Sequence, residues 1–270
     1  MLDRLTGLKN ILWAIGIALC LLLLFIGLIF SAATPYGGGA DPRTANLNAV
    51  KDQNSELDLS SLNFVNADGT LVTLKDTPDA GEEYLRSVVF LTDSIMVSLR
   101  SQSLTGGDIW SSDSGYLPMG SIGSWNILYS DGSKISPAEA CRVTKPAILI
   151  IAVGSDGLAS VTKEEFITGY ERLIAGILAE SPDTKIVCCS VAPVADGYSS
   201  LDGLTDEMAA NASDWVKEVC RATGVYFADT ADVVRSGSDL NPKYAAANNK
   251  ALNTEGLKAV LEYFRTHALS

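Results

Sequence analysis

The sequence predicts an α/β domain built on a parallel sheet with helices on both faces. Beyond residue 62, short apolar runs alternate with longer segments of helical periodicity. This alternation is typical of parallel strands that are covered by helices. The chain has 270 residues and 47% hydrophobic content, which suits one sizeable core. The strand candidates are residues 88–91, 147–153, 185–191 and 225–228.

Three helices have recognisable ends. Residues 162–165 (Thr-Lys-Glu-Glu) have the form of a capping box, and the apolar stripe that follows predicts a helix. A second helix is expected over 205–223, because acidic residues fill its first turn and Gly224 follows its end. The last helix is expected to start at Thr254, where the apolar residues again recur at helical spacing.

An aromatic-rich insertion over residues 104–137 interrupts this alternation. It carries Trp110, Tyr116 and Trp125 among many Gly and Ser residues. A loop of this kind over the carboxyl edge of the sheet could line a ligand groove. The alternative is that the rings only pack the loop against the domain, and the sequence favours neither.

An uninterrupted apolar run at residues 11–30 predicts a membrane anchor. It holds no charged residue, and about 20 apolar residues are what a helix needs to cross a bilayer. The alternative is a signal peptide cut after the small residues 31–33, although such apolar regions are usually shorter. Because Arg4 and Lys9 precede the run, the C-terminal bulk is expected outside the cytoplasm.

The expected organisation is therefore a single-pass protein of the cell membrane with an extracytoplasmic domain. The segment after the anchor is rich in Gly, Ala, Asn, Asp and Ser and has no sustained periodicity, which indicates a flexible linker. The expected parts are a cytoplasmic N-terminus (1–10), the transmembrane anchor (11–30), the linker (31–62) and the α/β domain (63–270).

Composition excludes some functions. The net charge is −12 and no basic run occurs, which argues against nucleic-acid binding. Cysteine spacing matches no zinc site; Cys188 and Cys189 read as small buried hydrophobes, while a disulfide from Cys141 or Cys220 stays open. No cofactor or metal is expected, because scattered carboxylates are usually solvated or cap helices.

Ser94 is the candidate nucleophile. Leu91-Thr92-Asp93-Ser94 ends the first predicted parallel strand and precedes a helix-like segment. A serine at such a turn is exposed at the carboxyl edge of the sheet, where helix N-terminal amides can stabilise developing negative charge.

With the blocks that follow, residues 87–269 resemble the SGNH (GDSL-type) hydrolase family. The resemblance implies a flavodoxin-like three-layer fold, with Ser94 as nucleophile in a Gly-Asp-Ser motif that here reads Thr92-Asp93-Ser94. The oxyanion-hole block Gly-x-Asn-Asp matches Gly154-Ser155-Asp156-Gly157, so Asp156 stands where the family has asparagine. A further oxyanion glycine is implied, for which Gly115 and Gly123 are candidates.

The family's last block, Asp-x-x-His followed by Leu-Asn, resembles residues 248–253. Asn248 stands at the aspartate position and Ala251 at the histidine position, in a register that Leu252-Asn253 and Gly256 support. The only histidine, His267, follows about 20 Å further along the last helix.

These departures predict an impaired site. A serine hydroxyl is a poor nucleophile without a base, and a carboxylate at the oxyanion position would repel the charge that acyl transfer develops. We expect a pseudohydrolase that binds cell-envelope glycans or other membrane proteins. The alternatives are an active serine O-acyl esterase of carbohydrate or lipid esters, with Asp93 or Asp156 as the base, and a subunit of a membrane assembly whose cleft has no ligand.

Overall fold

The computed structural model describes residues 68–199 and 203–269. The predicted anchor (11–30), the N-terminus before it and the linker (31–62) lie outside the described residues. Within the described ranges, no helix combines the length and the apolar character needed to cross a bilayer.

The described domain is built on a six-stranded parallel sheet, and the four predicted strands are confirmed as its middle. After β2 the chain adds β3 on one side and then β6, β7 and β8 in turn on the other, which is the flavodoxin-like order. The strands, in sheet order, are β1 (Val72–Thr73), β8 (Tyr226–Ala228), β7 (Lys185–Cys189), β6 (Ile148–Ala152), β2 (Val88–Thr92) and β3 (Ile109–Trp110).

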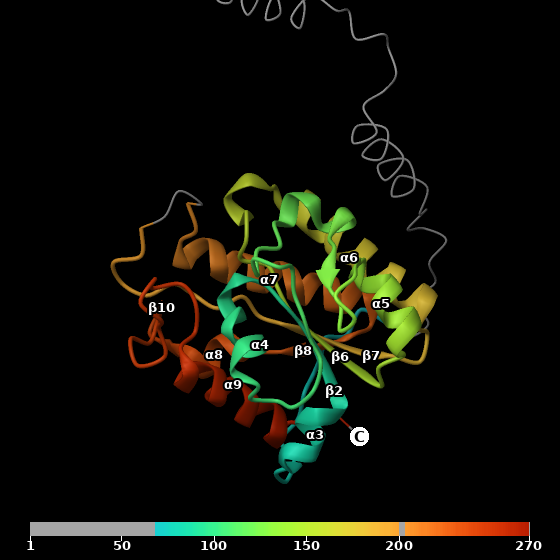
Figure 1. The fold of residues 1–270 in the computed structure, drawn as a ribbon. Helices are drawn as coiled ribbons and strands as arrows, with labels where there is room; N and C mark the ends of the chain where they lie inside the picture. Colours follow the sequence, from blue (N-terminus) through green and yellow to red (C-terminus); the bar gives the residue numbers. More distant parts are fainter. Residues whose placement is uncertain (1–67, 200–202, 270) are drawn as a thin grey trace, which may run out of the picture. The chain divides into compact units, whose positions relative to one another are not determined.

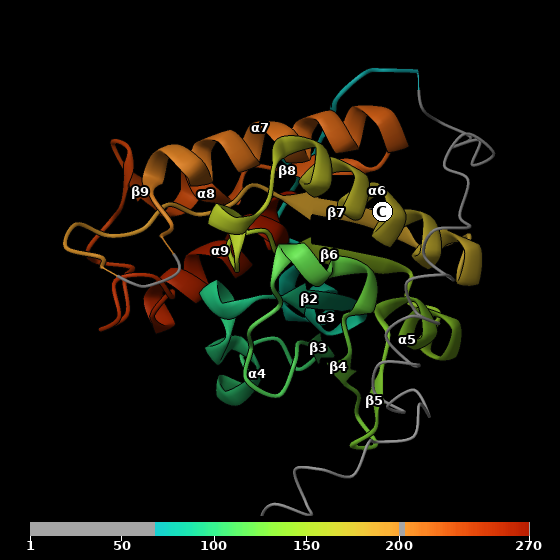
Figure 2. The ribbon, with the colours of Figure 1, turned by 90° about the horizontal axis from the view of Figure 1, so that it is seen from above.

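Helices cover both faces of the sheet, which gives the three predicted layers (Figures 1 and 2). Each face buries its own apolar cluster. One layer holds α5 (Pro137–Thr144), α6 (Lys163–Glu180) and α7 (Asp206–Thr223). The other holds α3 (Gly81–Ser87), α4 (Ser98–Gln102), α8 (Thr230–Val234) and α9 (Thr254–Thr266).

The three predicted helices begin where expected, and α7 also ends where expected. Thr162 and Glu165 form the reciprocal capping box that opens α6. Thr205 caps the start of α7, and Gly224 ends it in the left-handed conformation. The side chain of Asn253 accepts a hydrogen bond from Gly256 N–H at the start of α9.

The segment 104–137 contains regular structure. It contributes the edge strand β3 and a hairpin of β4 (Ile127–Leu128) and β5 (Lys134–Ile135). Trp110 and Trp125 are only 2% and 4% exposed and belong to the core, and the Trp125 indole N–H donates to Pro118 O at 2.9 Å. The prediction that these two rings line a ligand groove is therefore wrong. Tyr116, by contrast, is 44% exposed.

The four cysteines of the described domain are free and buried. Neither Cys141 nor Cys220 forms a disulfide in this structure. Burial raises the pKa of the Cys141 thiol to about 12 and that of Cys188 well above its ordinary value.

Candidate active site

The candidate site lies where two adjacent parallel strands end. Thr92, the last residue of β2, pairs with Ala152, the last residue of β6. The chain order reverses between these strands, and ligands of open α/β sheets bind outside the carboxyl ends of strands at such a switch point. Ser94 follows β2 in a short 3-10 helix, η2 (Ser94–Met96), and Asp156 follows β6. The topology therefore brings together two residues that are 62 positions apart.

The Asp93 carboxylate joins these two strand ends. Its Oδ2 accepts hydrogen bonds from Gly154 N–H, Ser155 N–H and Ser155 Oγ at 3.0, 2.9 and 2.8 Å. Its Oδ1 accepts from Ile95 N–H at 3.1 Å and so caps η2. Burial, followed by the nearby Asp156 charge, raises the pKa of Asp93 to about 6. Asp93 was a candidate base, but its carboxylate binds the Gly154-Ser155 loop and η2 rather than the Ser94 hydroxyl.

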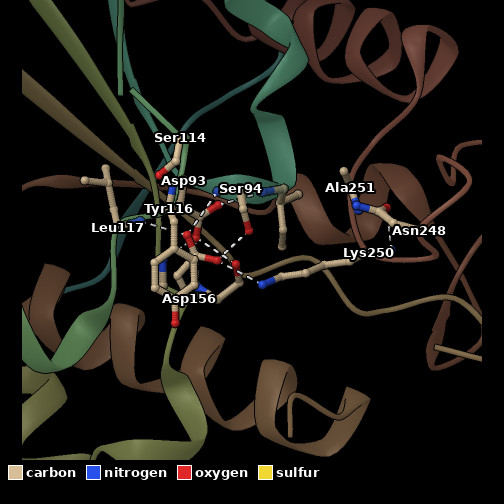
Figure 3. Close-up of polar contacts among 12 residues, drawn as sticks. Asp93, Ser94, Ser114, Tyr116, Leu117, Asp156, Asn248, Lys250 and Ala251 are labelled. Carbon is tan, nitrogen blue, oxygen red and sulfur yellow. Dashed lines mark hydrogen bonds and ion pairs between the residues drawn. The ribbon is translucent and has the colours of Figure 1, made fainter. Parts of the chain in front are cut away.

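The carboxylate beside the nucleophile position is that of Asp156. The Ser94 hydroxyl donates a hydrogen bond to Asp156 Oδ1, and Ser94 N–H donates to Oδ2 at 3.2 Å. Asp156 is fully buried, whereas Ser94 is partly exposed. One carboxylate therefore engages both the side chain and the backbone amide of the serine (Figure 3).

A second backbone amide converges on the same carboxylate oxygen. Leu117 N–H donates to Asp156 Oδ2 at 2.9 Å. Two amides that converge on one oxygen form the arrangement that holds an oxyanion in acyl-transfer enzymes. In this chain the oxygen that fills it belongs to Asp156, so the carboxylate at the asparagine position occupies the hole itself.

Neither Gly115 nor Gly154 donates to this position. Gly115 N–H donates to Ser112 O at 3.1 Å, within a turn. Gly154 N–H donates to Asp93, and Gly123 lies in a different 3-10 helix, η3 (Met119–Ser124). The assignments of Gly115 and Gly154 as oxyanion donors are corrected for this reason. The amide that reaches the hole is that of Leu117, two residues beyond Gly115.

Lys250 brings a positive charge to the site. Its Nζ lies 2.9 Å from Asp156 Oδ1, and the side chains of Lys250 and Asp156 are 8% and 0% exposed. A buried carboxylate is costly unless it is paired and hydrogen-bonded. Here Asp156 receives one ammonium, two amides and one hydroxyl, so its charge is well compensated.

The residues at the triad positions do not approach the serine through their own side chains. Asn248 Oδ1 accepts from the backbone N–H groups of Lys250 and Ala251 at 3.1 and 2.9 Å and so shapes a local turn. Ala251 has no group that can accept a proton. In Figure 3 the long Lys250 side chain, and not the neighbouring Ala251, extends from this loop to Asp156.

His267 is engaged at the far end of α9. Its Nε2 lies 3.0 Å from Asp76 Oδ1 and its Nδ1 lies 2.9 Å from Tyr263 O. Its ring also stacks on that of Tyr263, with centroids 4.0 Å apart. Both ring nitrogens thus have partners other than Ser94, and no other histidine exists in the chain.

The rim of the site carries an exposed aromatic side chain. Tyr116 precedes the oxyanion amide of Leu117, and its hydroxyl would lie 3.6 Å from a Cβ at Gly157. Val97, on the serine side, is 38% exposed. Over residues 68–199 and 203–269, no group of three or more metal-ligating His, Cys, Asp or Glu side chains occurs.

Fold and site together define an esterase-like α/β domain. Residues 131–259 match the model of the GDSL-like lipase/acylhydrolase family, and the resemblance of this domain to the SGNH (GDSL-type) hydrolases is confirmed. The matched segment includes Asp156 and Lys250 but begins after Ser94. No curated protein matches the chain.

The chain is similar to several solved structures, and the first of those that follow supports the fold. A candidate platelet activating factor from Streptococcus pneumonia aligns with a TM-score of 0.51 at 16% identity, over 84% of this chain and 98% of that chain. A candidate GDSL-like lipase from Parabacteroides merdae gives 0.47 at 13% identity, over 72% and 98%. A GDSL-like lipase from Bacteroides thetaiotaomicron gives 0.43 at 15% identity, over 69% and 88%.

Two residues of the site, Leu117 and Lys250, were not predicted from the sequence. Leu117 acts through its backbone amide, which any residue type supplies, so it has no sequence signature. Lys250 left a signal, because a buried aspartate at an asparagine position requires a compensating cation. Lys250 is the one basic residue inside the block 248–253.

Proposed function

We propose that this protein is a catalytically impaired member of its family, a pseudohydrolase that binds a ligand at the old active site instead of hydrolysing it. The observation that carries the proposal is the position of the Asp156 carboxylate. It accepts both amides of the oxyanion hole and also the hydroxyl of Ser94.

Hydrolysis of an ester would need these same amides. The carbonyl oxygen of the substrate must accept hydrogen bonds from them as it becomes negative, and Asp156 already occupies both. Losing an oxyanion donor typically costs about 10²- to 10³-fold in rate, and losing a general base costs about 10²- to 10⁴-fold. Both defects lower the same rate, so hydrolysis is expected to be negligible.

The ligand we propose is a cell-envelope glycan. Tyr116 presents an exposed ring and a hydroxyl at the rim, and rings of this kind combine an apolar face with a polar handle. Sugars offer the complementary surface, with apolar C–H faces beside hydroxyl groups. The hydroxyls of Ser112 and Ser114 lie on the same loop and add polar partners.

We also propose that the domain is held outside the cytoplasm. The support is the charge-free apolar run at 11–30, with Arg4 and Lys9 before it. The linker would then let the domain reach glycans of the cell envelope. Association with other membrane proteins is the outcome to expect if no glycan binds.

One observation favours a second candidate, an active serine O-acyl esterase. Asp156 is a carboxylate within hydrogen-bond reach of the Ser94 hydroxyl, as a non-histidine base would be. The two candidates differ in one measurable property, which is hydrolysis that depends on Ser94.

The test uses the full chain in detergent micelles with p-nitrophenyl acetate and an acetylated xylan. We expect turnover by the wild type to equal that of Ser94→Ala. Turnover that exceeds Ser94→Ala by tenfold or more would establish the esterase. As a positive control for the assay, the triple variant Asp156→Asn, Asn248→Asp, Ala251→His restores the family's residue types and is expected to gain Ser94-dependent activity.

A further inference from the structure

The site contains three buried ionisable side chains with unequal surroundings. Counted as whole residues, Asp93 is 1% exposed, Asp156 is 0% exposed and Lys250 is 6% exposed. Asp93 draws its partners from the backbone and from Ser155, whereas Asp156 has an ion-pair partner in Lys250. The negative charges of Asp93 and Asp156 are close enough to interact. Without Lys250, the two carboxylates would leave two buried negative charges with no cation beside them. Lys250 therefore compensates part of this negative charge.

The donors around Asp156 are fixed by contacts that do not involve its side chain. Ser94 begins η2, which Asp93 caps, and Ile95 O accepts from Leu252 N–H at 2.8 Å. Next to Leu117, Pro118 O accepts from the Trp125 indole at 2.9 Å. The two amides should therefore keep their direction when the Asp156 carboxylate is removed, and the hole they form is preorganised.

The loop that carries Lys250 is fixed in the same way. Asn248 Oδ1 accepts from the N–H groups of Lys250 and Ala251. Asn249 O accepts from Ala195 N–H at 2.7 Å, and Leu252 N–H donates to η2. The backbone on both sides of Lys250 is thus held in place, and its side chain is directed to the carboxylate.

We propose that Lys250 is a positioning residue that keeps Asp156 in the oxyanion hole as an internal anion, and that the hole binds an external carboxylate when Asp156 is removed. The inference rests on the proposed function, since it explains how the hole is closed. The chemical class of the external ligand is a small monocarboxylate. Three donors define the site: Ser94 N–H, Leu117 N–H and Lys250 Nζ.

The experiment uses formate, because Asp156→Ala removes a carboxylate group of that size. Thermal unfolding of the full chain is measured in sodium formate and in sodium chloride of equal ionic strength. At formate concentrations about ten times the dissociation constant, we expect the unfolding midpoint of Asp156→Ala to rise by about 3–6 °C relative to chloride. The wild type should not respond, because its hole is filled, and propionate should be too large to act.

A matched control is Asp113→Ala. Asp113 pairs with Lys134 at the surface, where the two side chains are 51% and 63% exposed. Formate should give this variant no shift. An equal response of the wild type or of Asp113→Ala would overturn the inference, because formate would then act elsewhere. If the unfolding midpoint of Asp156→Ala/Lys250→Met rose in formate as much as that of Asp156→Ala, Lys250 would take no part in binding formate, and the inference would be wrong.

A double-mutant cycle covers the case in which Asp156→Ala does not fold. Asp156→Asn and Lys250→Met each leave one buried partner alone, whereas the double variant removes both charges. We expect the double variant to unfold at a higher temperature than Lys250→Met alone, and Lys250→Arg to retain most of the wild-type midpoint. If the double variant lost as much stability as the two single variants together, the pairing of Asp156 with Lys250 would be refuted. Ser94-dependent hydrolysis by the wild type would refute the proposed function. The formate shift and the double-mutant cycle would still test the pairing of Asp156 with Lys250.

Discussion

Asp93 Oδ2 accepts hydrogen bonds from both the backbone N–H and the hydroxyl of Ser155, at 2.9 and 2.8 Å. This pair of bonds ties the end of β2 to the loop after β6. Because Ser94 follows Asp93 and Asp156 follows Ser155, the contact sets the distance between the nucleophile position and the carboxylate that engages it. Asp93 therefore organises the site through the backbone.

The first prediction concerns Asp93→Asn. The amide group would place a donor against backbone N–H donors, which should destabilise the domain by about 1–3 kcal/mol. The raised pKa of Asp93, about 6 against 3.8, means that its contribution to stability is greatest below about pH 4 and is lost as the pH rises through 6. The stability difference between wild type and variant should therefore shrink from pH 4 to pH 7 in urea titrations. A difference that grows over this range would contradict the assignment.

The second prediction concerns Gly115. Its role is steric: the position has no room for a side chain, and its N–H is not an oxyanion donor. A Cβ at this position would lie 2.2 Å from Val97 Cγ2, and φ is +79°. Gly115→Ala should destabilise the domain by about 2–4 kcal/mol, from overpacking and from backbone strain. Gly132→Ala is the matched control, because Gly132 has φ +86° but nothing within 4 Å. Its smaller loss measures the strain alone, and equal losses in the two variants would rule out the clash.

The third prediction concerns Tyr116 as a ligand contact. If a glycan stacks on its ring, Tyr116→Ala should weaken binding on a glycan array by about tenfold or more while the unfolding midpoint stays unchanged, because the side chain is largely exposed. Val143→Ala is the control, since Val143 is 54% exposed on α5, outside the site. Loss of binding in both variants would point to a nonspecific surface effect.

The fourth prediction concerns the buried thiols. Because the thiolate is the reactive form, burial and raised pKa values should make Cys141 and Cys188 inert to a disulfide reagent at pH 8. The fifth cysteine, Cys20, lies outside the described residues and is replaced by serine for this experiment. The native Cys20→Ser protein should react with fewer than one equivalent of reagent within minutes. All four thiols should react after denaturation. Fast labelling without denaturant would mean that the core opens readily.

The sequence predicted the regular elements because their signals are local. The capping box at Thr162 and the stop at Gly224 each act within one turn of helix. It missed β3, since a strand of two residues within a Gly- and Ser-rich segment shows no periodicity. Pairing with Phe90 and Leu91 of β2 creates that strand, and such a contact is not written in the segment itself.

The site was predictable in its residue types but not in its contacts. Ser94 and Asp156 follow strands whose ends must meet, so their proximity follows from the fold. The direction of the Asp156 carboxylate does not, because it depends on the Leu117 amide and on Lys250. Likewise, Asp93 and Asp156 are the same residue type near the same edge, and only the hydrogen bonds distinguish their roles.

The strand β1 has a consequence for how the domain meets its surroundings. Val72 and Thr73 run parallel to β8, so the polypeptide enters the sheet at its amino end, whereas Ser94 lies beyond the carboxyl ends. The entry of the chain and the site at Ser94 are therefore at opposite ends of the strands. Under the proposed membrane anchoring, the site at Ser94 would therefore open on the side of the sheet opposite to the entry of the chain at Val72.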